Sequence, residues 1–204
     1  MSPTIPTGKL VLLRHGETEW SKSGQHTGRT DLPLTDHGVE LARAAGGLLA
    51  GHDFVLALSS PLQRARRTAE LAGLSVDIDD DLMEWDYGGY EGRKTKEIRA
   101  ELGYDWSVFH HGVIPGETPG ETVEEVAARA SKVLARIGPA LADGDVALVG
   151  HGHALRILTT VFLRQEVRLA AQLLLDAGSV SVLQYDKEFP AIRTWNRLPV
   201  FPED

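Results

Sequence analysis

The stretch "LVLLRHGETEW" (residues 10–20) joins an apolar run to a charged pair and then to a polar segment. The apolar run is short and rich in Val and Leu, which is typical of a strand buried on both faces. A second stretch, "VALVGHG" (residues 146–152), repeats the pattern, because an apolar run again delivers a histidine followed by a glycine. Charged residues are rarely buried without a partner. Arg14 and His15 therefore need either a structural partner or a reactive role where the strand ends.

Strands and helices alternate on either side of these two runs. Further strands are predicted over residues 54–59, 75–78, 179–185 and 192–195, the last two as a hairpin-like pair. Helices are predicted over residues 36–50, 61–73, 94–102, 121–141 and 154–163. This alternation predicts one α/β domain over residues 1–204 with a largely parallel sheet.

Two segments lack this regular alternation. Residues 14–35 are polar with almost no apolar periodicity, and they predict a long loop of the kind that usually carries function. Residues 79–120 are dominated by acidic, aromatic and glycine residues. They predict an insertion that covers one end of the sheet.

Composition narrows the classes of function. The 204 residues carry a net charge of −8, which argues against general nucleic-acid affinity, since that affinity requires a basic surface. The chain has no cysteine, so disulfides, thiolate zinc sites and cysteine nucleophiles are excluded. The N-terminus has no apolar signal region, and no run approaches the ~18 apolar residues of a membrane span. These features predict a soluble, cytoplasmic protein with neither a nucleic-acid nor a membrane partner.

Cationic side chains are predicted to gather at one edge of the sheet, because ligands of such sheets bind beyond the carboxyl ends of the strands. The residues that follow strand ends or begin the next helix are Arg14, His15, Arg64, His151 and Arg156. In a protein of net charge −8, such a cluster favours an anionic ligand. Phosphate fits well, since arginine forms paired, charge-assisted bonds to it. The sequence therefore predicts a phosphate site.

Five motifs follow one another along the chain within residues 10–156. They are "LLRHGETEW", "TGRTDLPLTDHG", "SSPLQRARRTAE", "LMEWDYGGYEG" and "LVGHGHALR", with "LLDAGSVSVLQY" as a later match. In this order the chain resembles the histidine phosphatases, also called the phosphoglycerate-mutase-like superfamily. The resemblance implies a three-layer α/β/α fold with a mostly parallel central sheet. It also implies a phosphatase of the histidine acid phosphatase type, whose partner is a small-molecule phosphate ester and which needs no metal or other cofactor.

The resemblance also implies roles for the clustered residues. His15 would be the nucleophile that forms a phosphohistidine, with its other ring nitrogen held as a donor by a backbone carbonyl. Arg14, Arg64 and His151 would bind the phosphoryl oxygens and stabilise the charge of the transition state. Glu84 would be the general acid that protonates the leaving alcohol and then activates water.

Other residues invite the same roles but have more ordinary explanations. Glu17 is a weaker candidate for the acid than Glu84 and is predicted to orient neighbouring groups. The acidic run at residues 79–81 is predicted to be a solvated turn. Arg66 and Arg67 are predicted at the surface, because helical geometry turns them away from the face of the preceding arginine.

Histidine pairs raise the question of a metal site. "HGH" (residues 151–153) and "HH" (residues 110–111) are the two such stretches. Zinc sites usually need ligands at regular spacing with supporting partners. We instead expect His153 to begin a helix and His110 and His111 to lie in the covering insertion, so no metal is predicted.

Three stretches resemble a narrower group, the bacterial acid phosphatases and the fungal sedoheptulose 1,7-bisphosphatase-type enzymes. They are "TEWSKSGQHTGRTDLPLT", "DDDLMEWDYGGYEG" and "GHGHALR". The substrate contacts implied are Ser21, His26, Thr27, Gly28, Trp85, Tyr87, Gly152 and Arg156. Arg156 would serve a second phosphate. His26 stands where a tyrosine is expected in the sugar bisphosphatases, and ordinary packing explains Trp85 and Tyr87 nearly as well.

The superfamily holds two main chemistries, mutases and phosphatases, which share the same core residues. The glycolytic mutases carry an adjacent arginine pair in an extended segment, whereas residues 100–120 here contain no arginine. This favours a metal-independent phosphomonoesterase acting on small phosphorylated metabolites, above all sugar phosphates, through a phosphohistidine on His15. The alternatives are a 2,3-bisphosphoglycerate-dependent phosphoglycerate mutase and a non-catalytic phosphate-binding protein on the same fold. A homodimer through the last strands or the insertion stays open.

Overall fold

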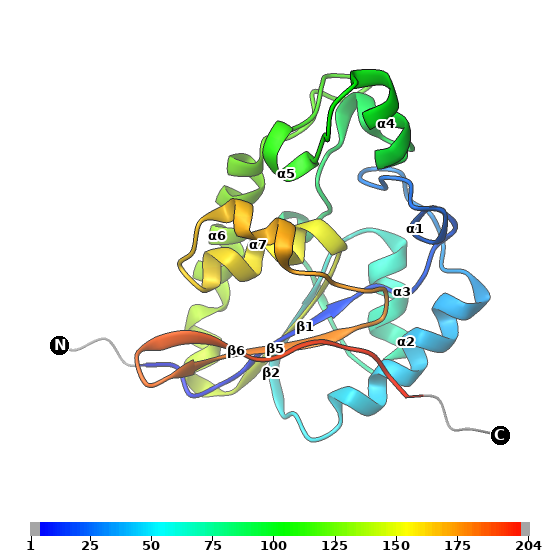
Figure 1. Cartoon of the computed structure of the whole chain (residues 1–204). Helices are drawn as coiled ribbons and strands as arrows, with labels where there is room; N and C mark the ends of the chain where they lie inside the picture. The colour runs from blue at the N-terminus through cyan, green and yellow to red at the C-terminus, as the bar shows by residue number, and fades with distance from the viewer. Residues whose placement is uncertain (1–4, 201–204) are drawn as a thin grey trace.

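The computed structural model describes residues 5–200 and contains a six-stranded sheet of order β3-β2-β4-β1-β5-β6 (Figure 1). Its strands are β1 (Leu10–Arg14), β2 (Phe54–Ser59), β3 (Asp77–Ile78), β4 (Asp145–Gly150), β5 (Val180–Asp186) and β6 (Phe189–Arg197). β1, β2, β3 and β4 are mutually parallel, whereas β5 runs antiparallel to β1 and β6 antiparallel to β5. The predicted α/β fold with a mostly parallel sheet is confirmed. Residues 1–4 and 201–204, the ends of the predicted domain, lie outside the described residues.

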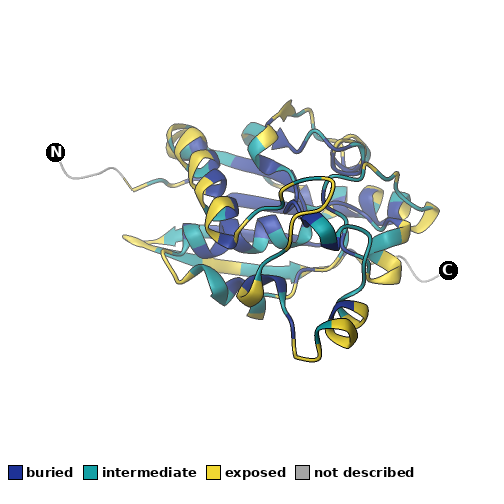
Figure 2. Cartoon of the chain, turned by 90° about the horizontal axis from the view of Figure 1, so that it is seen from above, coloured by how far each residue is buried: buried dark blue, intermediate teal, exposed yellow. Residues whose placement is uncertain are grey.

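Side chains alternate along β1 between two apolar clusters, one on each face of the sheet. Leu10 and Leu12 pack with α6 (Val123–Asp143) and α7 (Gly152–Phe162). Val11 and Leu13 pack with α2 (Asp36–Leu49) and α3 (Gln63–Leu71) on the other face. Because neighbouring side chains of a strand point to opposite faces, a continuous apolar run is what a two-sided strand requires. The buried centre of the molecule lies between helices whose outer faces are exposed (Figure 2).

The predicted insertion contains short elements around an apolar cluster of its own. They are η1 (Asp80–Leu82), η2 (Gly88–Tyr90), α4 (Thr95–Leu102) and α5 (Val108–His111). Trp85, Trp106 and Phe109 are the large members of this cluster, which continues onto Val126 of α6 and Ile157 of α7. α4 and α5 stand above the sheet on the side where α1 (Glu19–Ser23) lies (Figure 1). The insertion therefore has the buried core needed to hold a fixed position.

Several element boundaries differ from the sequence prediction. The segment 14–35 contains α1, which begins in a capping box where the Thr18 and Ser21 side chains each accept from the other residue's backbone amide. The usual capping-box signature has Glu or Gln three residues after the N-cap, whereas this chain has Ser21 there. The sequence pattern therefore did not indicate this helix start. β3 is shorter than predicted, α7 begins at Gly152 rather than at residue 154, and η3 (Val167–Gln172) was not predicted. No helix within residues 5–200 is long and apolar enough to cross a membrane.

Candidate active site

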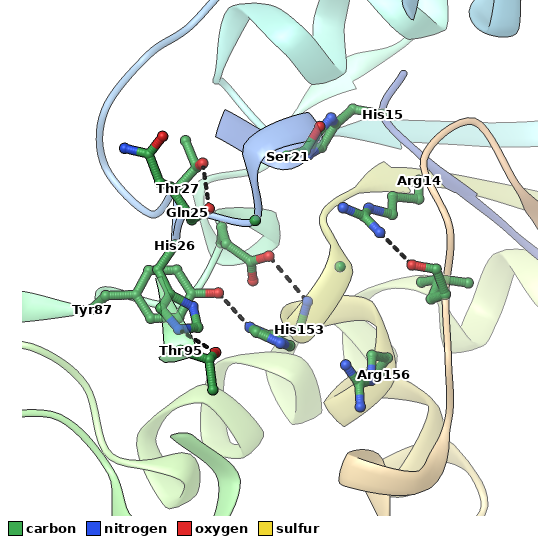
Figure 3. A pocket seen from close by; sticks show the side chains of 14 residues that line it. Arg14, His15, Ser21, Gln25, His26, Thr27, Tyr87, Thr95, His153 and Arg156 are labelled. Atoms are coloured by element: carbon green, nitrogen blue, oxygen red, sulfur yellow. Dashed lines mark hydrogen bonds between the residues drawn. The ribbon is translucent and has the colours of Figure 1, made fainter. Parts of the chain in front are cut away.

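A cavity of about 240 Å³ lies where β1 and β4 deliver their C-terminal residues (Figure 3). Its walls come from the end of β1, the segment after it, the insertion and the start of α7. The predicted site residues that line it are Arg14, His15, Ser21, His26, Thr27, Glu84, Tyr87, Gly152 and Arg156. The parallel sheet and the insertion thus bring these nine residues, which are spread over much of the sequence, to one cavity.

His15 directly follows β1 and is held by backbone bonds on both sides. Its amide donates to the carbonyl of Gly150 at 3.0 Å, and the amide of Gly178 donates to its carbonyl at 3.0 Å. The ring nitrogen Nδ1 lies 2.7 Å from the carbonyl oxygen of Gly16. A carbonyl only accepts, so Nδ1 carries the proton and Nε2 keeps its lone pair. Burial, with help from Arg64 and Arg14, holds the pKa of His15 well below its ordinary value, so the ring is neutral.

The turn after His15 is fixed by α3. The Gly16 amide donates to Thr68 Oγ1 at 3.0 Å, and this hydroxyl donates to the carbonyl of Arg64 at 2.7 Å. A side chain at Gly16 would collide with the carbonyl of Gly38. The glycine therefore permits the backbone of this turn to pack directly against the backbone of α2.

The guanidinium of Arg14 has one unused donor inside the protein. Its Nη1 donates to the carbonyl of Leu175, but its buried Nε has no hydrogen-bond partner within residues 5–200. A Cβ at Gly152 would lie 3.3 Å from the Arg14 Cζ, so Gly152 leaves space for the guanidinium. A buried donor without an acceptor costs about 1–3 kcal/mol. An acceptor oxygen placed beside this nitrogen would remove the cost.

Arg64 and His151 lie behind His15 rather than in the cavity wall. Both are fully buried, and the ring centroids of His15 and His151 are 5.1 Å apart. Arg64 Nε donates to His151 Nδ1 at 3.2 Å, which leaves Nε2 as the donor, 2.7 Å from Ser60 Oγ. Burial, together with Arg64, lowers the pKa of His151 well below its ordinary value. The remaining Arg64 bonds go to the carbonyls of Thr27, Gly28 and Thr30. Contact of these two residues with phosphoryl oxygens stays a prediction.

Glu84 is anchored at the N-terminus of α7. Its Oε1 accepts from the amides of Trp85 at 2.9 Å and Ala154 at 2.8 Å, and its Oε2 accepts from the amide of His153 at 3.0 Å. The residue is nearly buried, yet it is the one carboxylate among the residues that line the cavity. Oε2 has a single amide donor, so this oxygen has the free position for a proton.

The other nearby carboxylates that could serve as the acid form hydrogen bonds outside the cavity. Glu17 accepts from the Thr35 hydroxyl at 2.8 Å, and Glu91 accepts from the amides of Gly28 and Thr30. Asp86 accepts from the Gly88 amide at 3.0 Å and from the hydroxyl of Thr118 at 2.5 Å. None of the three lines the cavity. Glu84 therefore has the position expected for the acid.

A neutral wall of rings and hydroxyls faces the two arginines across the cavity (Figure 3). His26 Nε2 lies 3.2 Å from Thr95 Oγ1, and the rings of His26 and Tyr87 are 4.7 Å apart. The Tyr87 hydroxyl bonds to Nδ1 of His153. Burial lowers the pKa of His26 to about 4 and raises the pKa of Tyr87 well above its ordinary value. This wall therefore carries no charge near neutral pH.

Sequence reasoning missed part of this wall. The lining residues it did not identify are Gly24, Gln25, Thr95, His153 and Leu175. His153 was expected as a helix-start residue, and it does stand second in α7, but its ring also reaches the cavity. Gln25 lies inside a quoted motif, whereas Thr95 has no local signal, because only the fold brings α4 to this place.

Arg156 stands on the same side of the cavity as Arg14 (Figure 3). Its Nε donates to the carbonyl of Ala170 at 2.8 Å, and its Cζ lies 4.5 Å from the centroid of the Phe109 ring. Burial lowers its pKa to about 10, which still leaves it cationic at neutral pH. The cavity therefore has a cationic side and a neutral side.

Two predicted substrate contacts are not met by the structure. Trp85 is wholly buried, packs edge-to-face against Phe109 and donates its indole N–H to the carbonyl of Glu121 at 2.7 Å. Gly28 is covered by Glu91 and the backbone of Trp85. Neither residue lines the cavity. The reason is packing: both hold the segments that carry the lining residues.

The surface predictions are partly wrong. The acidic run at residues 79–81 is not a solvated turn, because Asp79 is buried and caps η1. Arg66 and Arg67 are exposed on α3, as expected from their helical positions. His110 and His111 lie in the insertion as predicted, but they form the exposed end of the short helix α5.

Comparison with known proteins decides the family. Residues 10–198 match the model of the histidine phosphatase superfamily, branch 1. The chain belongs to this superfamily. It is 38% identical over 181 residues to an acid phosphatase of Mycobacterium tuberculosis, with 87% of each chain covered. It is 36% identical over 187 residues to the sedoheptulose 1,7-bisphosphatase of Saccharomyces cerevisiae, covering 76% of this chain and 68% of that one.

Two further comparisons place this histidine phosphatase among its relatives. It is 38% identical over 170 residues to a 2,3-bisphosphoglycerate-dependent phosphoglycerate mutase of Azorhizobium caulinodans, covering 76% of this chain and 81% of that one. The solved structure of a Mycobacterium tuberculosis open reading frame product has a TM-score of 0.89 at 34% identity, covering 95% of this chain and 100% of that chain. The family and the fold expected from the five motifs are thus confirmed, and they support phosphoester hydrolysis.

The positive charge of this histidine phosphatase site comes from its arginines. Within residues 5–200, no group of three or more His, Asp or Glu side chains is arranged to hold a metal ion. Arg14 and Arg156 line the cavity, and Arg64 lies behind it.

Proposed function

We propose that this chain is a metal-independent phosphomonoesterase that hydrolyses small phosphorylated metabolites, above all sugar phosphates, through a phosphohistidine on His15. The observation that carries the proposal is the hydrogen bond from His15 Nδ1 to the carbonyl of Gly16. It fixes the tautomer in which Nε2 has a lone pair, in a ring that burial keeps neutral. A binding protein would need the cations but not this nucleophile.

In the first step, Nε2 of His15 attacks phosphorus and forms an N–P bond, while the bond from phosphorus to the ester oxygen breaks. Glu84, starting in its protonated form, gives its proton to the leaving oxygen, and an alcohol departs. Arg14 supplies donors to the phosphoryl oxygens as their charge is redistributed. The proton that stays on His15 Nδ1 is stabilised by the Gly16 carbonyl while the ring carries the phosphoryl group.

In the second step, a water molecule attacks the phosphohistidine. Glu84, now a carboxylate, takes a proton from the water as the new P–O bond forms. The N–P bond breaks, its electron pair returns to Nε2, and inorganic phosphate leaves. The cycle ends with Glu84 protonated and His15 neutral, so both groups are restored.

The shape and charge of the cavity favour a small substrate with hydroxyl groups. Its volume of about 240 Å³ suits a phosphorylated metabolite rather than a phosphoprotein. Arg156 lies beside the cavity as a second cation, which supports a substrate with a second anionic group. The neutral wall of His26 and Thr95 offers partners to sugar hydroxyls. The sedoheptulose 1,7-bisphosphatase relative supports the same substrate class.

The cavity also bears on the choice between hydrolysis and transfer. Residues 100–120 contain no arginine, so the insertion lacks the arginine pair that would grip a sugar-acid substrate in a mutase. Among the lining residues the arginines are Arg14 and Arg156. The mutase relative keeps phosphoryl transfer to a second substrate as the competing function.

Three assays test the proposal. The wild-type chain should release phosphate from p-nitrophenyl phosphate with EDTA present, and His15→Ala should lose this activity, whereas His110→Ala, an exposed histidine outside the cavity, should keep it. Enzyme denatured in detergent at alkaline pH during turnover should carry an acid-labile, alkali-stable phosphoryl group only when His15 is present. Activity that survives in His15→Ala would overturn the nucleophile.

The third assay offers 3-phosphoglycerate together with 2,3-bisphosphoglycerate. Free phosphate should form faster than 2-phosphoglycerate. The opposite order would make the chain a mutase.

A further inference from the structure

A nearly buried ion pair lies directly behind the segment that carries Glu84. Arg129 of α6 is 9% exposed, and its guanidinium meets the Glu121 carboxylate in a two-point contact. Nε donates to Oε1 at 2.8 Å and Nη2 donates to Oε2 at 3.1 Å. Planar, two-point pairs of this kind fix orientation as well as distance.

Both partners also bind the chain on either side of Glu84. Nη1 of Arg129 donates to the carbonyl of Met83 at 2.6 Å, immediately before Glu84, and to the carbonyl of Asp81 at 2.9 Å. Glu121 Oε2 accepts from the amide of Asp86 at 2.9 Å, and the Glu121 carbonyl accepts from the Trp85 indole. The ion pair thus binds residues 83, 85 and 86, and Glu84 sits between them.

We propose that the Arg129–Glu121 pair positions Glu84 for proton transfer, an inference that rests on the proposed function. Glu84's carboxyl is fixed at one end by amides of α7, and the pair fixes the backbone at the other end. Displacements of about 1 Å in a supporting shell are enough to disable such a group. Arg129 and Glu121 do not line the cavity, so they are positioning residues and not catalytic ones.

The same helix supplies a matched control. Arg136 stands seven residues after Arg129 on α6 and pairs with the carboxylates of Asp79 and Asp81 in the same insertion. Its side chain is 48% exposed, and its partners are the side-chain carboxylates of residues 79 and 81, not the backbone next to Glu84. Replacing Arg136 therefore weakens the attachment of the insertion to α6 without loosening the bonds on either side of the acid.

Leaving groups of different basicity reveal whether the acid is misplaced. p-Nitrophenolate leaves readily without a proton, whereas an alkoxide needs one, so an alkyl phosphate depends more strongly on Glu84. The quantity to measure is the ratio of kcat/KM for p-nitrophenyl phosphate to kcat/KM for an alkyl phosphate. General acids typically contribute 10²–10⁴-fold, so partial misplacement in Arg129→Lys should raise this ratio about tenfold. Glu84→Gln should raise it further, and Arg136→Lys should leave it within about twofold, because Arg136 bonds to neither residue that flanks Glu84.

A double variant makes the reasoning stricter. If Arg129 acts through Glu84, adding Arg129→Lys to Glu84→Gln should not raise the ratio again. If Arg129→Lys does not fold, as judged by circular dichroism, Glu121→Gln serves in its place, because it removes the charge while keeping the size and one acceptor. A variant that lowers both rates equally, with the ratio unchanged, would show a merely structural role and overturn the inference. Failure of the proposed function would instead be seen in the wild-type chain, as absent hydrolysis or as activity that survives in His15→Ala.

Discussion

Replacing Arg14 by methionine should separate function from stability. The change keeps an unbranched apolar stem and removes the cation. Without phosphate, the carbonyl of Leu175 loses its donor, which costs about 1–3 kcal/mol, but the unpaired Nε disappears, which returns a similar amount. The free energy of unfolding of the free protein should therefore change by less than about 1 kcal/mol.

Catalysis should respond far more strongly. A charge-assisted hydrogen bond is worth about 1.5–3 kcal/mol, and the guanidinium offers phosphate about two of them, through Nε and a terminal nitrogen. A loss of roughly 3–6 kcal/mol of transition-state stabilisation lowers kcat/KM by about 10²–10⁴-fold. Steady-state hydrolysis of p-nitrophenyl phosphate measures this fall. Arg66→Met, at an exposed position on α3, is the matched control and should leave kcat/KM unchanged.

Urea unfolding with and without inorganic phosphate supplies the second readout. Ligand at one hundred times its Kd stabilises a protein by about 2.7 kcal/mol, and Arg14→Met should lose most of this increment while Arg66→Met keeps it. The reasoning fails if Arg14→Met loses several kcal/mol without phosphate yet keeps the phosphate-dependent increment. That result would mean that Arg14 serves mainly to bond the segment around Leu175.

Two further predictions concern the surroundings of His15. Thr68→Val removes the hydroxyl that accepts from the Gly16 amide and donates to the Arg64 carbonyl. The free energy of unfolding should fall by about 1–3 kcal/mol, and kcat should fall with it. Thr68→Ser, which keeps a hydroxyl, should retain both values, whereas an active, fully stable valine variant would contradict the role. Burial lowers the pKa of four histidines: His15, His26, His151 and His153. Below about pH 6.5 the unfolded chain therefore binds more protons than the folded chain, so the free energy of unfolding decreases as the pH is lowered. At pH 5 the decrease is about 2 kcal/mol for each histidine whose folded pKa lies well below 5. Equal urea midpoints at pH 7.5 and pH 5 would contradict this.

The fold was predictable because its signals are local. Apolar runs such as residues 10–13 must be strands buried on both faces, and the clusters on the two sides of β1 show that they are. The order of the strands was not predictable in this way. β4 lies between β1 and β2, although residues 15–144 separate it from β1 in the sequence, and no local pattern encodes that pairing.

For the site, the sequence predicted which residues gather but not how deep each one lies. Strand ends bring Arg14, His15, Arg64 and His151 to one edge. Depth depends on where each donor finds an acceptor. Arg64 donates to His151 and to loop carbonyls, whereas the buried Nε of Arg14 has no hydrogen-bond partner within residues 5–200. Both residues are arginines near the end of a predicted strand, so the sequence could not show which one lines the cavity and which one lies behind it.

The polar segment after β1 explains the rest of the difference. It has no apolar cluster of its own, and the insertion supplies part of its order: Gln25 bridges to Lys94, and the His26 amide donates to the carbonyl of Arg93. Glu91, also in the insertion, binds the amides of Gly28 and Thr30, next to the carbonyls that hold Arg64. The insertion therefore carries the acid on its own chain and, through this segment, also supports the arginine behind the nucleophile. Because both links join residues far apart in the sequence, they become visible only in the folded chain.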